Sequence, residues 1–131
     1  KYMDIGGVPM AAGSEQRFAQ QLKKGVLEML VLRFLAEKPS HGYELIVRLR
    51  EKSGGLLELK EGTLYPILYR LEEEGCITSV WNSPDGKVSV GKIPRRVYTV
   101  TDAGLAMLTR QCETWHHFVD CVEQCMEGES Q

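Results

Sequence analysis

The 131-residue chain has no apolar run close to the roughly 20 residues that a helix needs to cross a bilayer. It also lacks an opening export signal, so we expect a cytoplasmic protein. No glycine-rich phosphate loop or nucleophile elbow is present, and the carboxylates of Glu72, Glu73 and Glu74 are typical of a solvated helix end. These absences argue against an enzyme, and we expect no cofactor.

Cysteine is scarce, and the four cysteines are Cys76, Cys112, Cys121 and Cys125. Three of them fall on one expected helix, where disulfide geometry is hard to satisfy, so reduced packing thiols are expected. The spacing of Cys112 with His116, and of His117 with Cys121, can also place two metal ligands on one helix face. We expect no metal, although zinc binding and thiol redox sensing at Cys121 or Cys125 stay open as alternatives.

An excess of positive charge is also missing, because the formal net charge is −2. The acid is concentrated in residues 101–131, which hold one basic and six acidic side chains. Residues 41–100 hold nine basic and eight acidic side chains, and four of these bases cluster without an acid between them: Lys87, Lys92, Arg95 and Arg96. The chain therefore offers a local basic patch of the kind that binds nucleic acid.

The first half of the chain has the periodicity of helices. Residues 1–14 show no sustained period and are expected to form a flexible leader that includes part of a tag. Apolar residues then recur at helical spacing from Ser14 to about Glu37. After Pro39, Ser40 is expected to cap a second helix that reaches Ser53 and ends at the following glycine pair.

A third helix is expected from Glu61 to Gly75, and it carries two different faces. An apolar stripe, expected to be core, is formed by Leu64, Ile67, Leu68 and Leu71. The opposite side carries hydroxyl and basic groups that can bind phosphates or base edges, supplied by Thr63, Tyr65, Tyr69 and Arg70 together with Lys60 just before the helix. A helix that packs on a core and shows such groups to solvent can enter a DNA groove.

Two β-strands are expected next, at 76–82 and 95–100, because these segments are rich in β-branched and aromatic residues. The turn signal Ser83–Lys87 lies between them, which gives an antiparallel pair with a basic tip. Trp81, on the first strand, is expected to pack. The order of elements predicts an α+β, mainly α fold, a winged helix-turn-helix followed by a long C-terminal helix.

The last helix is expected to begin at Thr101 as N-cap and to run to about residue 127. Its apolar residues alternate spacings of three and four, as in a coiled-coil seam: Leu105, Leu108, Cys112, Trp115, Val119, Val122 and Met126. A three-helix core cannot cover this stripe alone, so we expect a homodimer. Trp115 is interpreted as an interface anchor, or alternatively as the wall of a pocket for a flat aromatic effector.

Four motifs together resemble the PadR family of bacterial transcriptional regulators, over residues 20–127. They are Pro39–Leu45, Glu61–Pro66, Arg70–Ile77 and Arg96–Gly104. The single terminal helix is similar to the compact PadR subfamily. The resemblance implies a homodimeric repressor with the third helix in the major groove and the wing near the minor groove. It places Thr63 and Tyr65 in the recognition motif and Tyr43 in the motif that opens the second helix.

The sequence thus predicts a leader at 1–14, a winged helix-turn-helix domain at 15–100, a dimerisation helix at 101–127 and a tail at 128–131. The leading hypothesis is a ligand-responsive repressor that binds double-stranded DNA at an inverted repeat. One alternative is a winged-helix module that binds another protein. A second is a small-molecule sensor whose role on DNA is secondary.

Overall fold

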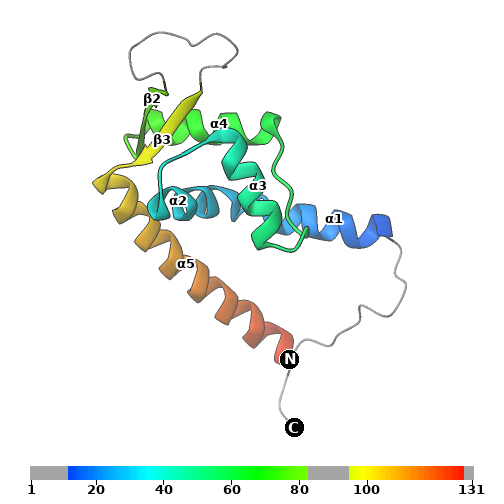
Figure 1. The fold of residues 1–131 in the computed structure, drawn as a ribbon. Helices are drawn as coiled ribbons and strands as arrows, with labels where there is room; N and C mark the ends of the chain where they lie inside the picture. The colour runs from blue at the N-terminus through cyan, green and yellow to red at the C-terminus, as the bar shows by residue number, and fades with distance from the viewer. Residues whose placement is uncertain (1–11, 83–94, 129–131) are drawn as a thin grey trace.

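The computed structural model describes residues 12–82 and 95–128, and it has the expected mainly helical, winged-helix architecture with a long terminal helix (Figure 1). The elements, in chain order, are α1 (Ala12–Lys23), α2 (Leu27–Glu37), β1 (Ser40–His41), α3 (Gly42–Lys52), α4 (Glu61–Glu73), β2 (Ile77–Trp81), β3 (Arg96–Val100) and α5 (Asp102–Glu127). The leader residues 1–11, the wing tip 83–94 and the tail 129–131 lie outside the described residues.

The helix expected from Ser14 to Glu37 is in fact two helices. A turn at residues 24–26 separates α1 from α2, and its backbone bonds run from Gly25 N–H to the Leu22 carbonyl and from Val26 N–H to the Lys23 carbonyl. These i to i−3 bonds close tighter turns than the helical ladder, so the regular α-helix is interrupted there. In consequence α1 projects from the fold while α2 lies in its middle (Figure 1).

The start of α3 also differs from the expectation, because His41 and not Ser40 is the cap. The His41 ring accepts a hydrogen bond from Glu44 N–H, and the Glu44 carboxylate accepts one from His41 N–H, which makes a capping box. Ser40 is instead buried, and its hydroxyl accepts a hydrogen bond of 2.9 Å from Arg48. Ser40 also belongs to β1, a strand that is too short to be predicted from the sequence.

The sheet is antiparallel with the order β1-β3-β2. β3 is central, with Tyr98 opposite Ser40 on one side and opposite Ser79 on the other. Figure 1 shows that the ends of β2 and β3 from which the wing extends lie beside α4. The strands therefore fix the base of the wing against that helix.

The core is formed by stripes from α2, α3 and α4, by the first part of α5 and by the inner face of the sheet. The expected stripe of α4 is confirmed, since Leu64, Ile67, Leu68 and Leu71 are all buried. At the other end of the domain, Gly104 permits the start of α5 to lie against the backbone of Cys76, because a Cβ there would collide with the Cys76 carbonyl. Thr101 caps α5 as expected, accepting a bond from Gly104 N–H.

Only the first part of α5 belongs to this core. Leu108 is buried, and Cys112 packs against the buried cluster at its edge. Beyond these residues α5 runs away from the domain (Figure 1). In the part of the chain that the structure describes, no helix combines the length and apolarity that crossing a membrane requires.

Candidate nucleic-acid interface

The outward side of α4 holds two tyrosines whose positions differ. The rings of Tyr65 and Tyr69 are 6.4 Å apart, centre to centre, on the same side of the helix. Tyr69 is exposed, whereas Tyr65 is half-buried because its ring lies over Gly42 at the start of α3. A Cβ on Gly42 would stand 2.6 Å from the Tyr65 hydroxyl, so the glycine is what allows the two helices this approach. Thr63, two residues before Tyr65, is exposed.

Arg70, expected to face DNA, is about half exposed and makes an ion pair with α2. Its Nη2 and Nε donate to Glu28 Oε1 of α2 at 2.8 and 3.2 Å. The other oxygen of Glu28 accepts a bond of 3.1 Å from Gln111 of α5. This carboxylate therefore joins the helix that carries the tyrosines to the terminal helix, and it pairs with the charge of Arg70.

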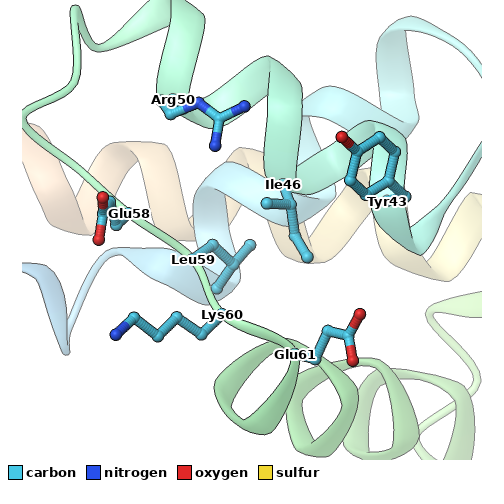
Figure 2. Close-up of a pocket in the computed structure, with 7 residues that line it drawn as sticks. All are labelled: Tyr43, Ile46, Arg50, Glu58, Leu59, Lys60 and Glu61. Atoms are coloured by element: carbon cyan, nitrogen blue, oxygen red, sulfur yellow. The ribbon is translucent and has the colours of Figure 1, made fainter.

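A hollow lies between α3 and the start of α4, and Figure 2 shows the side chains around it. Its apolar floor is Ile46 and Leu59, and its lining includes Tyr43, Lys60 and Arg50. Two carboxylates, from Glu58 and Glu61, also line it, so its charge is mixed. Arg50 was not singled out in the sequence, although Tyr43, Ile46 and Arg50 follow the i, i+3, i+7 spacing of one helix face.

The N-terminus of α4 opens at this hollow. Lys60 is the N-cap, and no side chain caps the first turn. Free N–H groups and the positive end of the helix dipole favour an anion at such a position. The exposed Lys60 ammonium adds to this field, while Glu61 in the first turn opposes it.

The sequence alone did not indicate a role for Gly62. It is exposed in the first turn of α4, has no positive φ, and a Cβ placed on it would meet nothing within 4 Å. Glycine costs helix stability relative to alanine, and nothing among the described residues requires it here. In the sequence, Gly62 is marked only by its position two residues before the apolar stripe, which begins at Leu64.

At the base of the wing, Arg95 is exposed, with its Nη1 3.0 Å from the Nε2 of His41. The Nδ1 of His41 already accepts the bond from Glu44 N–H, so a neutral ring carries its proton on Nε2. Two donors then face each other, and His41 cannot anchor the guanidinium. Arg95 keeps its hydrogen-bonding capacity for an acceptor outside the chain.

Arg96 is held more firmly. Its Nε donates to Ser79 Oγ at 2.7 Å, and its guanidinium carbon lies 5.4 Å from the centre of the Trp81 ring. Trp81, expected to pack, is 58% exposed. The aromatic and β-branched pattern of the strand did not indicate this exposure. Lys87 and Lys92 lie outside the described residues, as does the wing tip that carries them.

The expected seam on α5 divides into two parts. Leu108 and Cys112 pack on their own domain, whereas large exposed apolar side chains follow along the projecting part: Trp115, Phe118, Val122 and Met126. Leu105 is also exposed and Val119 is half-buried. Phe118, 58% exposed, was missed because it lies beside the heptad spacing. Helix α1 carries the same kind of surface, with Phe18 and Leu22 exposed.

The thiols are free wherever the structure describes them. Burial raises the pKa of the Cys76 thiol above its ordinary 9.0, so it stays neutral and packs. Cys121 Sγ lies 3.7 Å from His117 Nε2 on the exposed end of α5. Among residues 12–82 and 95–128, no three His, Cys, Asp or Glu side chains converge on a metal-sized site.

A helix with a buried stripe and a polar outer face, followed by a β-hairpin with arginines at its base, defines a winged helix-turn-helix protein. The family model described as "Transcriptional regulator PadR-like family" matches residues 31–110. The chain belongs to this family of transcriptional regulators.

Individual relatives are similar to this chain over most of its length. "Uncharacterized protein X" of Lysinibacillus sphaericus is 30% identical over 80% of this chain and 92% of its own. "Transcriptional regulator Rv3488" of Mycobacterium tuberculosis is 33% identical over 69% of this chain and 76% of its own. The crystal structure of a PadR family transcriptional regulator from Eggerthella lenta superposes with a TM-score of 0.77 at 32% identity, covering 90% and 96% of the two chains.

Proposed function

We propose that this regulator is a repressor that binds an inverted repeat as a homodimer and releases it when an aromatic effector binds at the dimer interface. The observation that carries the DNA-binding part is the outward face of α4. Thr63 and Tyr69 are exposed on it, Tyr65 is fixed in orientation by its contact with Gly42, and Gly62 leaves the first turn bare. A helix face of this kind suits the major groove.

Cationic groups surround this face at positions suited to the phosphate backbone. Lys60 lies at the open N-terminus of α4, and Arg95 and Arg96 lie at the base of the wing. Tyr43 and Arg50 of α3 border the hollow beside Lys60, and Arg50 adds a second cation to its lining (Figure 2). We assign Arg70 to the fold and not to DNA, since Glu28 occupies its guanidinium.

The homodimer is supported by the exposed apolar surface of α5 and α1. Burying a large apolar side chain contributes about 1.5–3 kcal/mol, so Trp115, Phe118, Val122 and Met126 in two copies can stabilise a dimer well. Leu108 stays inside each protomer and contributes to placing α5. With two copies of α4 related by a two-fold axis, half-sites should lie about 34 Å apart. Occupying such a site beside a promoter would repress transcription.

The binding site is tested by fluorescence anisotropy with a duplex from the region upstream of the chain's own gene and with a random duplex. Tyr65→Phe removes the hydroxyl and keeps the ring on Gly42, so the fold is retained. We expect it to lower affinity for the upstream duplex more than for the random one. Equal loss on both duplexes would contradict a role in base reading, and no binding at low salt would favour a protein-binding winged helix.

The effector site is tested by the fluorescence of Trp115 in a Trp81→Phe background, where it is the only indole. Planar aromatic compounds should quench it and weaken DNA binding in the same concentration range. Quenching without any change in DNA affinity would refute the coupling between the two sites.

A further inference from the structure

The base of the wing carries an exposed tryptophan whose ring contacts Arg96 among the residues that the structure describes. Trp81 is the last residue of β2, and it pairs across the sheet with Arg96, the first residue of β3. Directly opposed residues in an antiparallel pair project to the same side of the sheet. With 58% of its surface exposed, Trp81 leaves most of a large apolar ring in water. Exposed tryptophans are enriched at sites of macromolecular contact.

The neighbours of this ring give it a defined position. Glu72 of α4 accepts a hydrogen bond of 2.7 Å from Ser79 Oγ, and Ser79 Oγ accepts one of 2.7 Å from Arg96 Nε. The guanidinium so held stacks over Trp81. A chain of contacts thus runs from α4 through β2 to β3, and it fixes cation and ring together before anything binds.

The charge of Arg96 is only partly offset. The closest carboxylate oxygen, on Glu72, is 4.0 Å from its Nη2, and both side chains are partly exposed. No described group accepts a hydrogen bond from its Nη1. An oxygen of a phosphodiester is a suitable acceptor for the remaining N–H groups.

The same side of the molecule continues to the face of α4. Ser79 bonds to Glu72 of α4 and lies opposite Tyr98 in the sheet. Arg96 and Tyr98 are two residues apart on β3, so both project to this side of the sheet, toward α4. The ring of Trp81 and the guanidinium of Arg96 therefore border the surface proposed to enter the major groove. Figure 1 shows the ends of β2 and β3 beside α4.

Resting on the proposed function, we infer that Trp81 and Arg96 form a backbone clamp on duplex DNA. Arg96 binds a phosphate next to the groove that α4 occupies, and the Trp81 ring packs on the deoxyribose of the same nucleotide. A phosphate with an adjoining apolar sugar face matches a cation held against an indole. Because every nucleotide offers these groups, the clamp contributes affinity and not sequence preference.

The direct test uses the full chain labelled with 5-fluorotryptophan, whose two ¹⁹F resonances are assigned with Trp115→Phe. The H₂O/D₂O isotope shift of the Trp81 resonance reports its contact with water. We expect this shift to collapse when a labelled upstream duplex saturates the protein, as followed by anisotropy. Saturation with the shift of Trp81 unchanged would overturn the clamp and leave the proposed function intact. Failure of any duplex to bind would instead remove the proposed function.

A matched pair of variants supplies the second arm. Val80 is 66% exposed on the opposite side of the same strand. Trp81→Ala should lower affinity about tenfold for upstream and random duplex alike, whereas Val80→Ala should change it less than twofold. Similar small effects from both variants would overturn the inference. Thermal melts of each variant check that the fold is retained.

Discussion

Gly62→Ala separates the stability of the protein from its binding to DNA, because the two should change in opposite directions. Gly62 lies in the first turn of α4, and a Cβ there would meet nothing within 4 Å. Alanine is favoured over glycine in a helix by up to about 1 kcal/mol, and near a helix end we expect about half of that. The variant should therefore melt a few degrees higher than the wild type.

The same methyl group stands on the surface proposed to enter the groove. If the backbone of α4 lies against DNA at this point, the methyl prevents the close approach that glycine permits. We expect at least a tenfold loss of affinity for the upstream duplex, measured by anisotropy at one fixed salt concentration.

Gly25→Ala is the matched control, since a Cβ at Gly25 also meets nothing within 4 Å and the residue lies in the turn between α1 and α2. Its DNA affinity should stay within twofold of the wild type. A Gly62→Ala protein that is stabilised and still binds with full affinity would refute the placement of the first turn of α4 against DNA.

Three further predictions test other parts of the structure. Gly104→Ala should destabilise the domain by about 1–3 kcal/mol in chemical denaturation, because its Cβ collides with the Cys76 carbonyl; an unchanged midpoint would contradict this packing. Lys60→Ala should reduce the slope of log affinity against log salt concentration by about 1. Arg70→Ala should leave this slope unchanged and lower the stability of the fold, because Arg70 already pairs with Glu28. The raised pKa of Cys76 predicts that this thiol does not affect the free energy of unfolding below its ordinary pKa of 9.0. Above that pH the free energy of unfolding should fall, because the thiol ionises first in the unfolded chain. Denaturation curves at pH 8 and 10 should therefore show a smaller fall for Cys76→Ala than for the wild type.

Local periodicity predicted much of the fold. The stripe of α4 was readable because its four residues repeat with the helical period, and all four are buried. The end of that helix was readable too, since Gly75 takes a φ of 80° and Cys76 N–H then bonds back to the Leu71 carbonyl. Such signals lie within a few residues of the structure they specify.

Contacts between distant segments could not be read in this way. Arg70 meets Glu28 across 42 residues, so its role in holding the fold is invisible to helical spacing. Ser40 is drawn from the expected cap position into β1 by pairing with Tyr98. Trp81 lies in a segment whose aromatic and β-branched pattern predicts packing, yet it is 58% exposed. The sequence therefore indicated α4 as the candidate surface in outline, and that surface stays a prediction, while the contacts of single side chains needed the tertiary structure.

The stoichiometry on DNA tests the central proposal most directly. Sedimentation velocity of the chain with a duplex containing one inverted repeat should show two chains per duplex, and scrambling either half-site should abolish the complex at the same concentrations. A single bound chain, with affinity unchanged when one half-site is scrambled, would contradict the two-fold arrangement of the recognition helices.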